Sequence, residues 1–303
     1  MAFTKLAQTF EYLKDKPKKK LVAVFANDSH TIGAVSKAVK RGIIEGILVG
    51  DKEIITEVCK AENIDMSHFT IVHEPDEMKS ALTACDMINS GEGDIIMKGL
   101  LSTDKYMRAI LHKERGLMGK KAVLSHVTVF EIPSYHKLII AGDVAVIPAP
   151  DLNQKIAITN YLINTARALG IETPKVGILA ASEQTLPKMS ACVDAAIISK
   201  MAQRNQIKNA IVDGPLAFDL MVDMESVKIK KLESPVAGDV DCILFPNIES
   251  GNVFYKSMTR FAGAELGAFV AGAKVPAVLS SRGDTIQTKM YSIGLAATLA
   301  SMK

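Results

Sequence analysis

The sequence predicts an α/β protein with a mainly parallel sheet. Short apolar runs alternate with longer amphipathic runs along most of its 303 residues. This alternation is typical of βαβ units with right-handed crossovers. The length suggests two domains, since roughly 150 residues per domain is usual. We therefore expect two parallel α/β units, each with a ligand crevice at the carboxyl ends of its strands.

The first half supplies four of the expected strands. They are 21–26, 46–50, 69–73 and 94–99. The first helix should open at Asn27-Asp28-Ser29, because short polar side chains can cap the free N–H groups of a helix start. The next helices should begin at Asp51, near Pro75 and at Ser102.

The middle of the chain departs from this alternation. Two apolar runs, 122–132 and 136–150, are separated only by Pro133-Ser134-Tyr135. Because no helix fits between them, we expect an antiparallel or crossing element where the chain enters its second domain.

The parallel pattern then resumes. A helix over 151–169 should end before Gly170, a typical C′ glycine. A further helix is expected around 194–204, with strands at 175–180, 209–214, 241–246 and 275–281. The last helix should start at Thr285 and bury one face, formed by Ile286, Met290, Ile293, Ala297 and Ala300.

Composition excludes several classes of function. Net charge is only +3, aromatic residues are 5% and Trp is absent, so neither a nucleic-acid nor a membrane surface is expected. The four cysteines lack CxxC spacing, which argues against zinc and against a disulfide framework. No apolar leader and no run of about 18 apolar residues occurs, so we expect a cytoplasmic protein.

Four expected strand ends carry side chains that could bind a ligand or take part in a reaction. The first is at 94–103. Lys98 and Gly99 leave a strand, and Ser102 opens a helix. A helix start beside a cation and a hydroxyl favours phosphate. The simpler interpretation is a βα turn with a capping serine.

The second strand end is Asp213-Gly214-Pro215, which we expect to follow a strand. Its carboxylate could orient a ligand or a base. A turn formed by these three residue types is the alternative interpretation.

The third strand end is Ser250-Gly251-Asn252, which opens a helix carrying Lys256 and Arg260 on one face. Gly251 would permit close backbone approach to a ligand, and the helix start favours anions. A capped surface helix would explain the same residues.

The fourth strand end, 280–285, gives the strongest indication of function. It places Ser281, Arg282 and Asp284 between a buried strand and an apolar helix. Arginine offers a fork of donors to an anion, serine a hydroxyl donor and aspartate a possible base. No nucleotide-binding glycine motif, P-loop, HExxH or GxSxG accompanies it.

Together these segments resemble the phosphate acetyl/butyryl transferase family, most closely its phosphate butyryltransferase branch. The resemblance covers the chain from about residue 94 onward and is carried by IIAGDVAVIPAPDLNQK (139–155), VDGPLAFD (212–219), FPNIESGNVFYKS (245–257) and KVPAVLSSRGDT (274–285). It implies reversible transfer of a short-chain acyl group between CoA and orthophosphate, without a metal or a covalent acyl-enzyme. The substrates would be acyl-CoA, phosphate and acyl phosphate, with CoA as a substrate and no permanently bound cofactor.

The resemblance also implies an architecture. We expect two parallel-sheet α/β domains facing a cleft, as in the isocitrate and isopropylmalate dehydrogenases, in a homodimer. Residues 1–124 plus 273–303 would form the first domain, and 125–272 the second.

Site residues are carried over from this resemblance. Thiolate attack on an acyl phosphate needs a base, donors for the developing oxyanion and cations for phosphate. The serine-arginine pair of the acetyl members corresponds to Ser281 and Arg282. Their proposed basic aspartate corresponds here to Thr288, so we assign the base to Asp284. For CoA we assign Ser250, Gly251, Asn252, Lys256 and Asp213, and for phosphate the candidates are Lys98, Ser102, Arg108 and Arg260.

Two other functions remain open from the sequence. A metal-dependent 2-hydroxy-acid dehydrogenase of the same architecture would need clustered aspartates, and none of the expected helices carries a DxxxD pair for them. A non-catalytic protein that binds CoA or acyl phosphate is the second alternative, because a binding cleft does not prove turnover.

Overall fold

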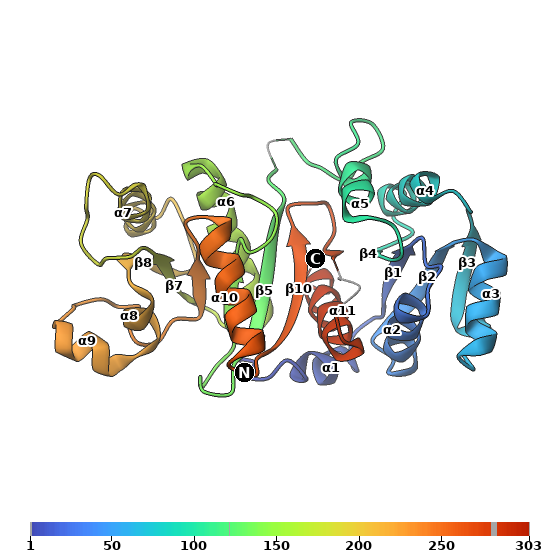
Figure 1. Cartoon of the computed structure of the whole chain (residues 1–303), viewed down its shortest axis with the longest axis horizontal. Coiled ribbons are helices and arrows are strands. Elements are labelled where there is room, and N and C mark those ends of the chain that lie inside the picture. Colours follow the sequence, from blue (N-terminus) through green and yellow to red (C-terminus); the bar gives the residue numbers. More distant parts are fainter. Residues whose placement is uncertain (1, 121, 280–283, 303) are drawn as a thin grey trace. The chain divides into compact units, whose positions relative to one another are not determined.

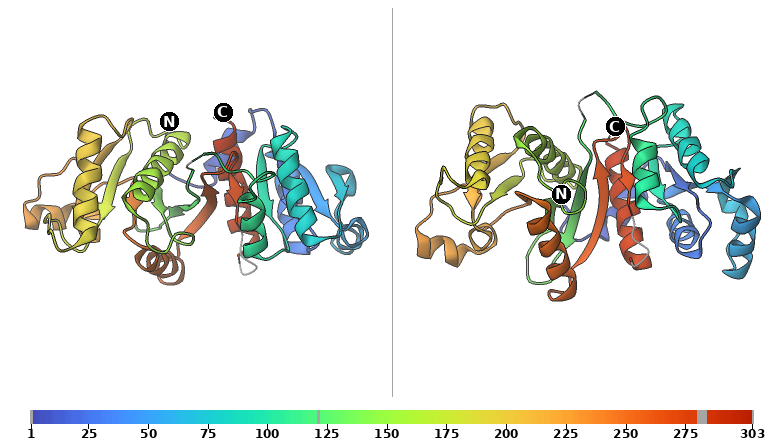
Figure 2. Two further views of the ribbon diagram at one scale, coloured as in Figure 1. Left: turned by 90° about the horizontal axis from the view of Figure 1, so that it is seen from above. Right: turned by 45° about the horizontal axis from the view of Figure 1, so that its top comes forward.

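The computed structural model describes residues 2–120, 122–279 and 284–302. Its contacts divide the chain into two compact units. We call residues 7–122 and 267–303 the N-terminal unit, and residues 1–6 and 123–266 the central unit. Figures 1 and 2 show the elements of each.

The N-terminal unit is an α/β layer structure. Its strands follow the order β3-β2-β1-β4-β11-β10, in which only β10 and β11 pair antiparallel. Their bounds are β1 Lys19–Val24, β2 Ile44–Gly50, β3 Phe69–His73, β4 Ile95–Lys98, β10 Glu265–Ala271 and β11 Ala277–Val278.

Helices cover both faces of this sheet. They are α1 Gln8–Leu13, α2 Ser29–Lys40, α3 Lys52–Ala61, η1 Met66–His68, α4 Glu77–Asn89, α5 Thr103–Ile110 and α11 Ile286–Ala300. Helices α4 and α5 lie on one face, whereas α1, α2 and α11 lie on the other (Figure 1). Most helix starts are fixed by side-chain caps of the expected kind: Asp28, for example, accepts a hydrogen bond from Thr31 N at 2.9 Å.

The central unit has the strand order β5-β6-β9-β7-β8. Its strands are β5 Ser125–Glu131, β6 Ile139–Gly142, β7 Lys175–Leu179, β8 Ile211–Leu216 and β9 Cys242–Leu244. Its helices are α6 Leu152–Ala168, α7 Ser190–Gln203, α8 Phe218–Val222, α9 Met224–Lys230 and α10 Ile248–Arg260. The antiparallel element predicted around Pro133-Ser134-Tyr135 is confirmed, because β5 and β6 pair antiparallel.

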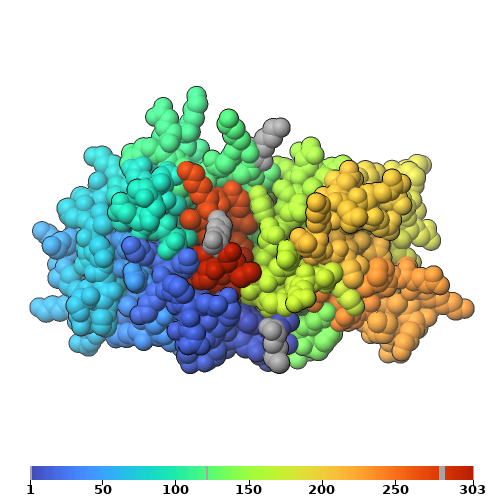
Figure 3. Space-filling view, turned by 180° about the vertical axis from the view of Figure 1, so that it is seen from behind, coloured from blue at the N-terminus to red at the C-terminus, as the bar shows by residue number. Residues whose placement is uncertain are grey.

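Helix α11 is more deeply buried than its sequence pattern predicts. Its residues are buried on nearly every side, whereas Ile286, expected in the buried face, is 38% exposed. The cause is α1: a Cβ on Gly294 would lie 2.8 Å from the Phe10 ring, so only glycine allows this helix contact. In Figure 3 the C-terminal segment, in red, accordingly lies against N-terminal residues in blue.

Two segments are divided differently between these units than between the expected domains, 1–124 plus 273–303 and 125–272. Residues 1–6 belong to the central unit, where Leu6 N donates to Glu131 at 2.8 Å. Residues 267–272 belong to the N-terminal unit, because Gly267 packs on Tyr291 of α11 and Val270 pairs with Ala277.

Among the described residues, no helix is both long and apolar enough to cross a membrane.

Candidate active site

Lys98 ends β4 and is 5% exposed. Its Nζ donates to the Gly99 carbonyl at 3.2 Å. A Cβ on Gly99 would lie 2.4 Å from the Val24 carbonyl oxygen, so glycine is required where the chain passes the end of β1. The structure therefore fixes a buried ammonium group at the carboxyl end of the sheet.

Strand β11 runs parallel to β4, with Val278 opposite Met97. The chain consequently leaves β11 beside Lys98 and enters residues 280–283. Two of the assigned catalytic residues, Ser281 and Arg282, lie outside the described residues. Asp284 is described and half-buried, and Thr285 caps α11 by accepting from Thr288 N at 3.1 Å.

Tyr106 fastens β4 to β11, a role that the sequence did not suggest. Its single hydroxyl hydrogen is shared between two carbonyl oxygens, those of Ile96 at 3.1 Å and Val278 at 3.3 Å from the hydroxyl oxygen. Burial raises its pKa well above the ordinary value, so the hydroxyl remains a donor at neutral pH. It therefore holds the strand end from which residues 279–285 continue.

The start of α5, expected to favour phosphate, is already occupied by a carboxylate. Ser102 caps this helix by accepting from Lys105 N at 3.3 Å, and Ser102 N donates to Glu77 Oε1 at 3.2 Å. Lys105 forms an ion pair with the same Glu77. Arg108 lies at the exposed end of α5 and pairs with Asp104 at 3.1 Å. Of the candidates on β4 and α5, Lys98 is the one that burial and position favour.

In the central unit, α10 follows β9, and its start packs against the loop that follows β6. Asn247 caps the helix by accepting from Ser250 N at 3.0 Å, and Ser250 Oγ donates to the Asn247 carbonyl at 2.9 Å. A Cβ on Gly251 would lie 2.2 Å from the Asp143 carbonyl oxygen, and Asn252 Nδ2 donates to the Val144 carbonyl at 3.2 Å. The close approach predicted at Gly251 thus brings helix and loop together, rather than helix and ligand.

Asp143 organises this loop and was missed by the sequence analysis. Its buried carboxylate accepts from the N–H groups of Ala145 at 2.7 Å, Val146 at 2.8 Å and His126 at 3.0 Å. A buried carboxylate with three such donors holds a loop firmly. The sequence does show Gly142-Asp143 directly after an apolar run, which could have indicated a loop held by the aspartate. It does not show that His126 is a partner of this aspartate.

The other assigned residues of the central unit lie further apart. Asp213 lies within β8, which continues through a cis Gly214–Pro215 bond to Leu216. The expectation that Asp213-Gly214-Pro215 follows the strand is therefore wrong, and so is the alternative of a turn. Lys256 is exposed on α10, with its Nζ 4.8 Å from the Tyr255 ring centroid. Arg260 ends α10, about 15 Å along the helix axis from Ser250 at 1.5 Å per residue.

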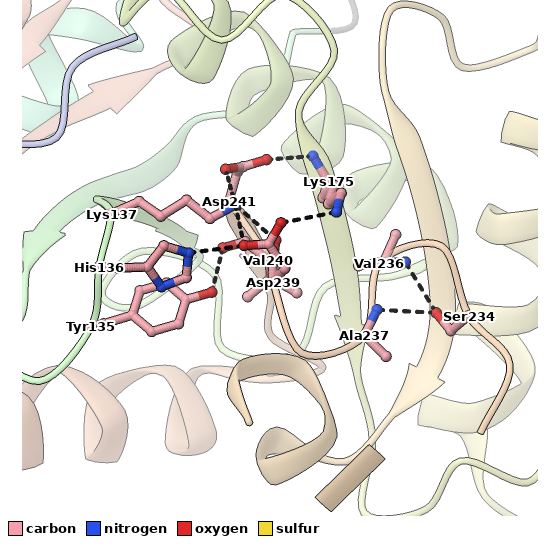
Figure 4. A network of polar contacts seen from close by, with 10 residues as sticks. All are labelled: Tyr135, His136, Lys137, Lys175, Ser234, Val236, Ala237, Asp239, Val240 and Asp241. Atoms are coloured by element: carbon pink, nitrogen blue, oxygen red, sulfur yellow. Dashed lines mark hydrogen bonds and ion pairs between the residues drawn. The ribbon is translucent and has the colours of Figure 1, made fainter. Parts of the chain in front are cut away.

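A different polar network lies at the amino-terminal ends of β6, β7 and β9 (Figure 4). Lys137 Nζ donates to Asp241 at 2.7 Å, and Lys175 Nζ to Asp239 at 2.9 Å. Burial alone would raise the pKa of Asp239. Hydrogen bonds from Lys175 and Lys137, the charge of Lys137 and a bond from His136 outweigh burial and lower this pKa to about 2. Because it lies at the opposite strand ends from Asp143 and Asn247, we assign this network to stability.

Comparisons with known proteins identify the family of this chain. A family model described as Phosphate acetyl/butaryl transferase matches residues 74–297, a range that includes every assigned site residue. The chain is 42% identical over 291 residues to phosphate butyryltransferase from Clostridium acetobutylicum, with 96% of each protein covered. It is 39% identical to phosphate acetyltransferase from Thermotoga maritima, covering 93% of this chain and 95% of that protein.

A solved structure gives the same result. The branched-chain phosphotransacylase from Enterococcus faecalis V583 matches with a TM-score of 0.81 at 31% identity. The match covers 93% of this chain and 99% of that one. The three relatives are named for three different acyl groups.

Proposed function

The chain belongs to the phosphate acetyl/butyryl transferase family and is a phosphate acyltransferase, and on this premise we propose that it transfers a short-chain acyl group between CoA and orthophosphate in a ternary complex. The observation that carries this proposal is the junction after β11. Strand β11 pairs with β4, which ends at the buried Lys98, and the SRGD segment of the family resemblance follows β11 in the sequence.

The proposed chemistry balances without a covalent enzyme intermediate. An oxygen of hydrogen phosphate attacks the thioester carbon, the C–O bond forms and the C–S bond breaks. The proton lost by hydrogen phosphate passes through Asp284 to the leaving thiolate. In reverse, Asp284 accepts the thiol proton and the thiolate attacks the acyl phosphate. Ser281 donates to the oxyanion that develops on the carbonyl, and Arg282 binds phosphate through its fork of donors.

The geometry within each unit suggests which other residues bind phosphate and CoA. Lys98 supplies a buried positive charge for phosphate, a stronger candidate than Ser102, whose helix start already holds Glu77. In the central unit we propose CoA contacts for Ser250, Asn252, Lys256 and Asp213, while Gly251 seats α10 on the Asp143 loop. Arg260 lies too far along α10 to act with Ser250 on one phosphate group.

The family resemblance also supports a homodimer with the dehydrogenase-like domain architecture and a cytoplasmic location. Light scattering should then give twice the 32.6 kDa chain mass. A mass equal to one chain at assay concentration would overturn the dimer.

One assay tests the proposed reaction and separates it from the alternatives. The protein is incubated with butyryl-CoA, with and without phosphate and EDTA, and free thiol is measured. We expect thiol release that depends on phosphate and is unaffected by EDTA. CoA binding without thiol release would instead identify a non-catalytic binding protein.

A further inference from the structure

A pocket of about 660 Å³ lies entirely within the N-terminal unit, between the end of α2 and the start of α11. Its lining combines three cations with polar and apolar groups. They are Lys37, Lys40, Arg41, Thr285, Ile286, Gln287 and Met290. This volume is in the range of about 300–1,000 Å³ that is usual for small-molecule sites.

The cations of this pocket are exposed to solvent and close together in sequence. Within the described residues, Lys37, Lys40 and Arg41 form no salt bridge or side-chain hydrogen bond. Arg41 is oriented by the Phe10 ring, with its guanidinium carbon 4.6 Å from the ring centroid. The charge of Lys40 is compensated in part by the nearby Asp65, but three positive charges around one pocket still favour a ligand with more than one negative charge.

Helix α11 adds neutral donors to the lining. Ile286 and Gln287 are its first two residues, and the first backbone bond of the helix runs from Lys289 N to the Thr285 carbonyl. The N–H groups of Ile286 and Gln287 therefore have no acceptor within the helix. Together with the cations, they suit phosphate oxygens.

The remaining lining is apolar. Met290 is 4% exposed, and Ile286 lies beside it on the same wall. A simple inorganic anion would gain nothing from this surface, whereas a heterocyclic ring would bury part of its area there. Phosphates attached to an aromatic base fit both halves of the pocket.

We propose that this pocket binds the phosphate-bearing adenosine of a nucleotide. The chemistry is shared by two sources: the 3′-phosphorylated ADP end of CoA and a free adenine nucleotide. For CoA the inference rests on the proposed function. Asp284, the assigned base, directly precedes Thr285 of the pocket.

Calorimetry with adenosine 3′,5′-bisphosphate and with ADP tests binding without turnover. The double variant Lys37→Gln/Lys40→Gln should bind at least roughly tenfold more weakly than wild type, because it loses two charge-assisted contacts. The matched control is Lys60→Gln, which removes an exposed lysine from the last turn of α3, outside the pocket. If the lysines only stabilise helix ends, the double variant and the control should bind like wild type, and the proposal is wrong.

Gln287→Glu separates ligand binding from helix stability. A carboxylate in the first turn of α11 stabilises the helix dipole but repels phosphate. We expect an unchanged or higher melting temperature together with weaker nucleotide binding. Unchanged binding in this variant would contradict the pocket assignment.

Kinetics identify the source of the nucleotide. If CoA occupies the pocket, the double variant raises the KM for butyryl-CoA while kcat is retained, and adenosine 3′,5′-bisphosphate competes with butyryl-CoA. If a free nucleotide occupies it, the variant loses ADP binding but keeps the KM for butyryl-CoA. Nucleotide binding that is lost in the variant, in a protein that releases no thiol, would support the pocket while overturning the proposed function. Absence of binding of both nucleotides to wild type would overturn the pocket.

Discussion

Arg282 and Arg108 are both candidates for anion binding, but we expect only Arg282 to be needed for turnover. Arg108 pairs with Asp104 and its side chain is 72% exposed, whereas Arg282 follows Ser281 in the family segment. We expect Arg282→Ala to lower kcat by about 10²–10³, the usual loss for one transition-state donor. Arg282→Lys should recover only part of it, because lysine lacks the bidentate geometry. Arg108→Ala is the control and should turn over like wild type; equal losses in both variants would refute the assignment.

Asp284 is assigned as the base on its position alone, and pH dependence tests that role. A free thiol has a pKa of about 8.5. Asp284→Asn should therefore slow attack on butyryl phosphate at neutral pH, and raising the pH toward 8.5 should recover part of the rate. A pH–rate profile that matches wild type would move the base to another residue and leave the transferase assignment intact.

The packing of helix α10 against the Asp143 loop depends on one glycine, Gly251. A Cβ on Gly251 would meet the Asp143 carbonyl oxygen at 2.2 Å, so Gly251→Ala must displace the helix start. We expect a lower midpoint of urea unfolding and a higher KM for CoA. Gly33→Ala in α2 is the matched control: a Cβ there meets nothing within 4 Å, and loss of glycine from a helix interior should stabilise by about 0.5–1 kcal/mol. Equal stability changes in the two variants would contradict the packing.

The network that joins β6, β7 and β9 predicts acid sensitivity. Burial works to raise the pKa of Asp239, but bonds from Lys175 and Lys137 lower it to about 2, below the ordinary value of about 3.9. Because the folded pKa is depressed, this stabilisation is complete above about pH 4 and is lost as pH falls toward 2. Asp239→Asn should be less stable than wild type at pH 7, with the difference shrinking in acid. A difference independent of pH between 7 and 2.5 would refute this origin.

Some helices and strands could be predicted from the sequence pattern, and others could not. Strands β1, β2, β3 and β4 stand out because continuous apolar runs separate capped helices. Strand β10, Glu265–Ala271, was missed, since Gly267 and two alanines give it little strand character. Those small residues are needed by the packing: a Cβ on Gly267 would meet Tyr291 of α11 at 2.9 Å. Helices α1, α8 and α9 were also missed, being too short to show a helical period.

For the whole molecule, the candidate site residues could be chosen from the sequence because they follow predicted strands. The contacts among them could not be predicted. Lys98 and the 280–285 segment were predicted separately, and the parallel pairing of β4 with β11 brings their strands together. The roles of Tyr106 and Glu77 could not be predicted, because each acts on residues distant in sequence. Asp143 was missed although two of its donors, Ala145 and Val146, are its near neighbours in the sequence. Ser102 was predicted as a phosphate candidate, but its helix start holds Glu77 instead. The local sequence is the same in either case, so it could not distinguish the two.

The central claim for the whole molecule is direct acyl transfer between two substrates bound together. Steady-state thiol release, measured with butyryl-CoA varied at several fixed phosphate concentrations, tests it most directly. A ternary complex predicts double-reciprocal lines that intersect. Parallel lines, the kinetic sign of a ping-pong reaction through an acyl-enzyme, would contradict the account.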